Sequence, residues 1–314
     1  MPTAPDALPS GRKSPPVATF SQWVEGSRPR TWPAAFAPVA AGTGAALHEL
    51  SVRGEAVDLG LVLPRALIAL GVALALQIGV NYANDYSDGV RGTDDERVGP
   101  FRLTGSGAAR PAVVKRAAVL SLGVGAALGV ILTVLSGALW MLAIGAAAVA
   151  AAWFYTGGSR PYGYLGLGEV FVFVFFGLVA VMGTAFAITG AFTLVALLAA
   201  CAIGLLAVAV LVTNNLRDIP TDTEAGKLTL AVRLGDRRTR LLYAACMIGP
   251  FALLVPVMIA HWPAALVLLA LPLAVAPVRT VLAGAAGRGL IPVLGATGRV
   301  ELVASVLLLI GLAI

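Results

Sequence analysis

Long apolar runs constrain the fold of this chain more than any other feature of the sequence. A helix needs roughly 20 apolar residues to cross about 30 Å of hydrocarbon, and runs near that length recur along the chain. With 59% hydrophobic and only 12% charged residues, an ordinary soluble domain is excluded. We predict an all-α, polytopic membrane protein with nine spans, near 32–47, 64–84, 113–134, 138–156, 168–188, 192–213, 241–260, 263–282 and 296–314.

The distribution of Lys and Arg predicts the orientation of these spans, because short loops rich in positive charge stay in the cytoplasm. With a cytoplasmic N-terminus, the basic stretches 12–30, 91–116 and 217–240 share that side, whereas the other side holds essentially Arg53 and Arg65. We therefore expect a multi-pass protein of the cell (inner/cytoplasmic) membrane. Residues 1–19, rich in Pro and Ser, predict a disordered cytoplasmic tail. Residues 20–314 would form one domain with two halves, roughly 20–160 and 161–314.

A polar motif, NYANDYSD, stands at the end of the second apolar run. It places Asn81, Asn84, Asp85 and Asp88 at i, i+3, i+4 and i+7, which is one face of a helix. A single acid at the end of a membrane helix is more often a solvated residue at the headgroup level than a ligand. That explanation is weaker for a matched set of oxygen-bearing side chains.

A second polar motif, NNLRDIPTD, ends the sixth apolar run. It places Asn214, Asp218 and Asp222 at i, i+4 and i+8. Carboxylate and amide oxygens are the ligands that Mg²⁺ prefers, and Mg²⁺ sites often combine a few carboxylates with phosphates of the substrate. Two such helix ends on one side of the membrane could hold a diphosphate through Mg²⁺.

Basic and aromatic side chains on the same predicted side are further candidates. Arg102, near a flexible LTGSG turn, could reach a phosphate bidentately. Lys227 either balances charge near the second motif or grips the diphosphate. Tyr155 belongs to an aromatic-rich segment that could be an interfacial belt, although its ring could instead stabilise a cation.

These strings resemble the UbiA superfamily of intramembrane aromatic prenyltransferases over nearly the whole chain. The resemblance lies in NYANDYSD, the FRLTGSG loop, YTGG followed by PYGYLGLGE, and NNLRDIPTDTEAGKLTLAVRLG. The last two strings are most similar to the branch that prenylates 1,4-dihydroxy-2-naphthoate in menaquinone biosynthesis. The final Asp of the family's first motif is Gly92 here, which leaves Asp94 and Asp95 as candidate replacements.

The resemblance implies nine helices around a central cavity that opens to the cytoplasmic side and laterally to the bilayer. It implies Mg²⁺-dependent ionisation of an allylic polyprenyl diphosphate and attack on the cation by an aromatic acceptor, with loss of CO₂ to give demethylmenaquinone. The expected partners are these substrates and the lipid bilayer, with no nucleic acid among them. The implied metal ligands are Asn84, Asp85, Asp88, Asn214, Asp218 and Asp222.

The remaining roles follow from position together with the resemblance. The implied catalytic residues are Asp88, Asp218, Lys227 and Tyr155. The implied substrate-binding residues are Arg28, Arg102, Arg160, Lys227, Asn81 and Asn215.

Three alternatives stay open at this point. The acceptor could be another aromatic compound, such as hydroxybenzoate or homogentisate. An ion-coupled transporter also carries intramembrane acids, but typically near the bilayer midplane at broken helices. A scaffold without activity has no evident need for oxygen ligands in matched registers.

Overall fold

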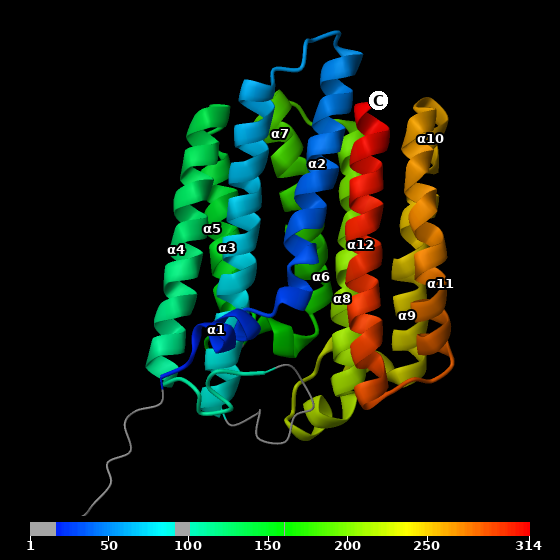
Figure 1. Cartoon of the computed structure of the whole chain (residues 1–314). Coiled ribbons are helices and arrows are strands. Elements are labelled where there is room, and N and C mark those ends of the chain that lie inside the picture. Colours follow the sequence, from blue (N-terminus) through cyan, green and yellow to red (C-terminus); the bar gives the residue numbers. More distant parts are fainter. Residues whose placement is uncertain (1–16, 92–100, 160) are drawn as a thin grey trace, which may run out of the picture.

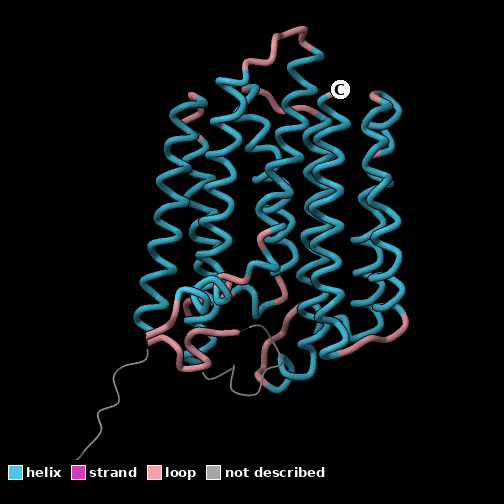
Figure 2. Tube along the Cα trace, viewed as in Figure 1, coloured by secondary structure: helices cyan, strands magenta, loops and turns pink. Residues whose placement is uncertain are grey.

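Helices make up the regular structure of this chain, and they run side by side in one bundle (Figure 1, Figure 2). The computed structural model describes residues 17–91, 101–159 and 161–314. The all-α prediction is confirmed, and the described residues contain no strand. In chain order the elements are α1 (Phe20–Gly26), η1 (Pro29–Thr31), α2 (Pro33–Val52), α3 (Leu59–Arg91), α4 (Pro111–Ser136), α5 (Met141–Phe154), η2 (Tyr162–Leu165), α6 (Gly168–Val172), η3 (Phe173–Met182), α7 (Gly183–Thr189), α8 (Leu194–Glu224), α9 (Leu230–Leu253), α10 (Val255–Ala260), η4 (Trp262–Ala270), α11 (Leu271–Leu282), η5 (Gly287–Gly289) and α12 (Leu290–Ala313).

Seven helical segments of the described chain are long and apolar enough to cross a membrane. They correspond to the predicted second, third and fifth to ninth spans. The predicted fourth span is the shorter α5, of 14 residues, and the predicted first span is α2, of 20 residues, which is not among the seven. The multi-pass architecture is therefore confirmed, whereas the count of nine spans is not.

The helices that carry the two polar motifs are longer than the apolar runs predicted. α3 continues through Asp88 to Arg91, and α8 continues past Pro220 to Glu224. Backbone hydrogen bonds extend a helix regardless of side-chain polarity, and here the polar side chains are buried in the protein. The motifs therefore lie within the last turns of helices, where helical spacing fixes their relative directions.

Two other segments differ from simple straight spans. The segment Gly168–Thr189 contains a π-helical stretch, η3, between α6 and α7. The predicted span at 241–260 begins earlier, at Leu230, and bends at Gly235, whose φ of 73° is left-handed. Sequence periodicity did not predict either feature.

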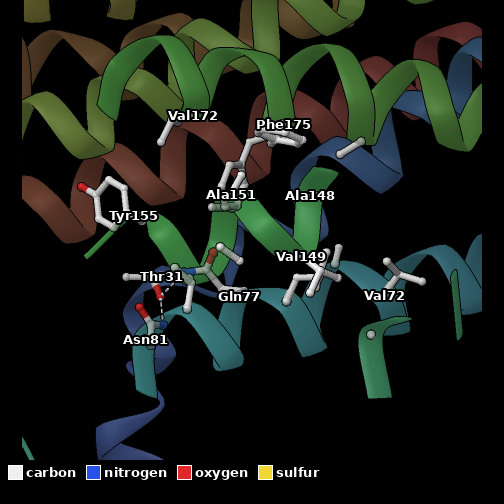
Figure 3. Close-up of a pocket in the computed structure, with 18 of the residues that line it drawn as sticks. Thr31, Val72, Gln77, Asn81, Ala148, Val149, Ala151, Tyr155, Val172 and Phe175 are labelled. Atoms are coloured by element: carbon white, nitrogen blue, oxygen red, sulfur yellow. Dashed lines mark hydrogen bonds between the residues drawn. The ribbon is translucent and has the colours of Figure 1, made fainter. Parts of the chain in front are cut away.

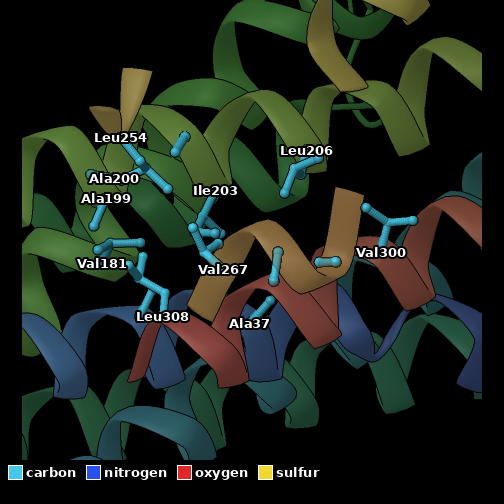
Figure 4. Close-up of a cluster of buried hydrophobic side chains, with 14 of the residues drawn as sticks. Ala37, Val181, Ala199, Ala200, Ile203, Leu206, Leu254, Val267, Val300 and Leu308 are labelled. Carbon is cyan, nitrogen blue, oxygen red and sulfur yellow. The ribbon is translucent and has the colours of Figure 1, made fainter. Parts of the chain in front are cut away.

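The main core lies where α2, α8, α9, α12 and η4 pack together, and many of its side chains are small (Figure 4). Ala37, Ala199 and Ala200 are all fully buried. Small residues allow helix backbones to approach closely, which is how helices pack in a membrane. Gly177 of η3 and Gly204 of α8 meet in this way, because a Cβ on Gly177 would lie 2.7 Å from the Cα of Gly204.

The motif-bearing ends of α3 and α8 lie at the same edge of the bundle as α1, and the C-terminus lies at the opposite edge (Figure 1). The predicted tail, residues 1–19, ends where α1 begins, with Thr19 and Gln22 forming a capping box. Residues 1–16 of that tail lie outside the described part of the chain. The bundle thus gathers both polar motifs at one edge.

Candidate active site

A large cavity opens inside the bundle and reaches both polar motifs. Its volume is about 1410 Å³, and its wall includes Asn81 and Asn84 of α3 together with Asn214 and Arg217 of α8. Figure 3 shows one part of this wall, in which the Thr31 hydroxyl accepts hydrogen bonds from Gln77 and Asn81. Two helices about 130 positions apart in the sequence therefore face the same space.

The cavity is polar at one end and apolar along the rest of its length. On α3 its wall runs from Asn84 back to Ala69, a distance of about 22 Å at 1.5 Å per residue. Val130 of α4 and Leu142 of α5 line it and are 48% and 42% exposed. The apolar part is therefore lined in part by α4 and α5.

In the first motif, Asp88 is the residue that side chains from other segments contact. Its Oδ2 accepts a hydrogen bond from Arg102 at 3.0 Å, and its Oδ1 accepts one from the Tyr164 hydroxyl at 2.6 Å. The Lys227 ammonium lies 3.6 Å from Oδ1. Three segments far apart in the sequence thus converge on one buried carboxylate.

Lys227 is placed by the end of α8. Gly226 adopts a left-handed φ of 67°, which turns the chain so that the Lys227 amide donates to the Asp222 carbonyl at 2.8 Å. The ammonium then lies 4.6 Å from the centroid of the Tyr164 ring, a cation–π contact. Burial and the nearby Asp88 carboxylate raise the pKa of Tyr164 above its ordinary value, so its hydroxyl remains a donor.

Asp85 holds the loop that follows α3. Its two carboxylate oxygens accept the backbone N–H groups of Leu103 and Thr104 at 2.6 and 2.9 Å. This pair of bonds fixes the loop just after Arg102, whose guanidinium reaches Asp88. Asp85, predicted as a metal ligand, thus anchors a loop in this structure.

Asn84, Asn81 and Arg28 sit along the cavity wall. The Asn84 Oδ1 accepts a hydrogen bond from Thr156 at 2.7 Å, and the Asn81 amide donates to the Ser27 carbonyl at 2.8 Å. Arg28 has a left-handed backbone with φ 55°, an uncommon conformation for a residue other than glycine. The turn it forms before η1 brings the segment 28–31 to the cavity.

Arg217 organises the second motif, and sequence reasoning missed it as a site residue. Its guanidinium binds both carboxylate oxygens of Asp218, at 2.7 and 2.8 Å, and also the Asn214 Oδ1 at 2.7 Å. Arg217 is only 7% exposed and lines the cavity. Its position next to Asp218 and three residues after Asn214 could have indicated, from the sequence, that Arg217 belongs to the site.

Asn215, predicted to bind substrate, points away from the cavity. Its amide donates to the Glu169 Oε1 at 2.9 Å, and Asn215 is not among the residues that line the cavity wall. The reason is helical: Asn215 follows Asn214 by one residue, about 100° around the axis. Only one of the two adjacent Asn side chains can face the cavity.

Aromatic rings form part of the wall near the polar end. Tyr155, Tyr162, Phe171 and Phe175 line the cavity, and the Tyr162 and Phe171 rings stack with centroids 3.9 Å apart. Tyr155 was a sequence candidate, whereas the two Phe residues were not.

The oxygen donors at this site suit a hard cation whose remaining ligands are supplied by the substrate. In the residues described, no three His, Cys, Asp or Glu side chains lie close enough together to hold a metal ion by themselves. Mg²⁺ commonly takes one or two carboxylates and keeps water or phosphate oxygens as its other ligands. Asp88, Asp218 and Asp222 are buried oxygen donors, and Asn84 and Asn214 add amide oxygens on the cavity wall.

Most of the predicted site residues lie at this one edge of the bundle, and three positions cannot be placed. Asp94, Asp95 and Arg160 lie outside the described residues. Tyr164, Thr156 and Arg217 join the site without having been predicted.

Comparisons with known proteins all point to one family of prenyltransferases. The sequence pattern of the UbiA prenyltransferase family matches residues 32–289. A 1,4-dihydroxy-2-naphthoate octaprenyltransferase of Mycobacterium tuberculosis is 54% identical over 91% of this chain and 95% of that protein. The Escherichia coli protein of the same name is 39% identical over 74% of this chain and 75% of that protein.

Solved structures share the fold at low sequence identity. An apo UbiA homolog from Aeropyrum pernix K1 has a TM-score of 0.66 at 16% identity, over 86% of this chain and 94% of that one. A UbiA homolog from Archaeoglobus fulgidus bound to GPP and Mg²⁺ has a TM-score of 0.61 at 14% identity, over 91% of this chain and 99% of that one.

Proposed function

Because the chain belongs to the UbiA prenyltransferase family, we propose that it transfers a polyprenyl group from an allylic polyprenyl diphosphate to 1,4-dihydroxy-2-naphthoate. Diphosphate and CO₂ leave, and the product is demethylmenaquinone. The observation that carries the proposal is a cavity whose polar end is lined by Asn residues of both motifs and whose apolar length suits an isoprenoid chain. The names of the relatives supply the acceptor.

Asn84, Asp88, Asn214, Asp218 and Asp222 are the side chains that would hold Mg²⁺. When bound, the ion supplies positive charge that stabilises the departing diphosphate. A UbiA homolog of the same fold from Archaeoglobus fulgidus is bound to GPP and Mg²⁺, which supports a role for this ion here. Asp85 is the weakest member of the predicted ligand set, because both of its oxygens accept backbone N–H groups.

The chain's own residues account for the other requirements of the reaction. Arg102 and Lys227, both at Asp88, bind the diphosphate and stabilise its growing charge. The rings of Tyr155 and Phe175 face the cavity, where an aromatic face stabilises an allylic cation. The apolar wall excludes water, which would otherwise capture that cation.

The position of the polar groups favours an enzyme over a carrier. Asp88 and Asp222 lie in the last turns of α3 and α8, at one edge of the bundle, and an ion-coupled carrier typically binds near the midplane. We place this edge on the cytoplasmic side of the cell membrane, because the basic segments gather there.

The test incubates purified protein with a polyprenyl diphosphate and 1,4-dihydroxy-2-naphthoate, with Mg²⁺ or with EDTA. We expect pyrophosphate, CO₂ and a prenylated product detected by mass, all lost on chelation. Product with hydroxybenzoate or homogentisate alone would keep the reaction class and refute the acceptor. Absence of turnover with every acceptor would refute the proposal and favour a transporter.

A further inference from the structure

The basic side chains of the site already occupy the oxygen atoms proposed for Mg²⁺. Arg217 binds both oxygens of Asp218 and the amide oxygen of Asn214. On the facing helix, Arg102 and Lys227 hold Asp88 in the same way. The second motif thus carries its own cation in Arg217, whereas Asp88 of the first motif receives its cations from other segments of the chain.

Burial explains why these ion pairs form. The side chains of Arg217 and Asp218 are only 4% and 3% exposed, and a buried charge without a partner is costly. A divalent cation that entered alone would displace the guanidinium and leave it buried without an anion. Mg²⁺ alone should therefore bind only weakly at this site.

A diphosphate changes this balance, because its oxygens offer the displaced guanidinium a new partner. Guanidinium geometry matches phosphate oxygens bidentately. Arg217 is suited to such a move: it lines the cavity, and its bonds to Asp218 and Asn214 lie within its own helix. If the Arg217 side chain rotated towards the cavity, the bonds to Asp218 and Asn214 would break, but neither of these bonds joins two different helices.

We propose that Arg217 is a diphosphate-binding residue that takes the place of Mg²⁺ on Asp218 and Asn214 in the substrate-free protein. It moves to the diphosphate when both ligands arrive. This inference rests on the proposed function, which makes Mg²⁺ and a diphosphate the ligands. Binding of the two is then coupled, and each raises the affinity for the other by the same factor.

The experiment is a calorimetric titration of the purified full chain with MgCl₂, without and with saturating inorganic pyrophosphate. For the wild type we expect Mg²⁺ to bind at least about fivefold more tightly with pyrophosphate, the lower end of common coupling factors. Arg217→Gln removes the internal cation. Mg²⁺ alone should then bind more tightly than to the wild type, pyrophosphate alone more weakly, and the coupling factor should fall towards one.

The opposite signs of these changes separate the proposal from a structural role, which would weaken both ligands together. Arg217→Lys keeps the charge and should retain part of the coupling. Arg53→Gln removes a positive charge at the far edge, where Arg53 pairs with Glu49, and should change neither titration. Weaker or unchanged binding of Mg²⁺ alone to Arg217→Gln, with coupling intact, overturns the proposal.

If Arg217→Gln does not fold, the wild type and Arg217→Lys still decide the matter. A wild type without coupling overturns the proposal, and coupling that is reduced in the Lys variant supports it. The titrations contain no prenyl donor and no aromatic acceptor. Coupling as expected without prenyl transfer would sustain the role of Arg217 and refute the proposed function, whereas prenyl transfer without coupling would do the reverse.

Discussion

At the scale of single residues, Asp88 is where Arg102, Tyr164 and Lys227 meet. We expect Asp88→Asn to lower the turnover of the Mg²⁺-dependent reaction by at least about 100-fold, because even outer partners of metal ligands are worth about 10–100-fold. An amide keeps the shape of the carboxylate, so the protein should still elute as a folded species in detergent. The measurement is steady-state prenyl transfer at saturating Mg²⁺.

Asp58→Asn is the matched control for this change. Asp58 is exposed at the opposite end of α3, where its side chain accepts the Gly60 amide at 2.8 Å. Its variant should keep wild-type turnover. Turnover near that of the wild type in Asp88→Asn would remove Asp88 from the proposed metal ligands.

Asp85 should behave differently from Asp88, although the two are only three residues apart. An Asn at this position has one acceptor oxygen in place of two, and its NH₂ group would face a backbone N–H. Leaving one buried donor unsatisfied costs about 1–3 kcal/mol. We expect Asp85→Asn to lower the melting temperature in detergent and to speed amide hydrogen exchange in the segment 101–107.

The distinguishing readout for Asp85 is Mg²⁺ binding measured together with pyrophosphate. If Asp85 only anchors the loop, Asp85→Asn should lower the affinity for Mg²⁺ less than Asp88→Asn does. An equal loss of affinity in the two variants, with unchanged exchange in the loop, would assign Asp85 to the metal instead.

At the scale of elements, the contact between η3 and α8 holds one wall of the cavity in place. η3 contributes Phe175 and Phe176 to that wall, and α8 contributes Asn214 and Arg217. A Cβ on Gly177 would lie 2.7 Å from both the Ala200 carbonyl oxygen and the Gly204 Cα, which are backbone atoms and cannot turn aside. The two helices would have to separate.

We therefore expect Gly177→Ala to destabilise the protein by about 1–3 kcal/mol, the usual cost of overpacking. The measurement is thermal unfolding in detergent. Gly249→Ala in α9 is the control, since no atom lies within 4 Å of its added Cβ. A melting temperature for Gly177→Ala equal to or above that of the control variant would contradict the close approach.

At the scale of the whole molecule, the cavity joins a polar end to an apolar length lined in part by α4 and α5. Gly129 of α4 lines this apolar part, and a Cβ there would meet no atom within 4 Å. Gly129→Phe should fill space that a long isoprenoid needs. We expect kcat/KM to fall more for a long polyprenyl diphosphate than for geranyl diphosphate.

Gly123→Phe provides the comparison on the same helix. Gly123 also has open space at its Cβ, but it does not belong to the cavity wall. Its variant should treat long and short donors as the wild type does. Equal losses for both donors in Gly129→Phe would show that the chain does not pass this point.

The sequence by itself determined most of the membrane-spanning segments and the two motif faces. Apolar length fixes which segments can span a membrane, and the spacing of Asn84 and Asp88, or of Asp218 and Asp222, fixes a common direction on a helix. Both are local properties, set by 1.5 Å of rise and about 100° of turn per residue. The contacts of Arg217 could also have been predicted from local spacing, because its partners are one and three residues away on α8.

Only the tertiary structure decided which groups contact each carboxylate. Asp85 and Asp88 look equivalent in the sequence, yet one binds the loop backbone and the other receives Arg102, Tyr164 and Lys227. Helical spacing likewise left Asn214 and Asn215 undistinguished until the packing of α8 against α6 turned Asn215 towards Glu169. The partners of these side chains come from distant segments, and the packing that brings those segments together is not a local property of the chain.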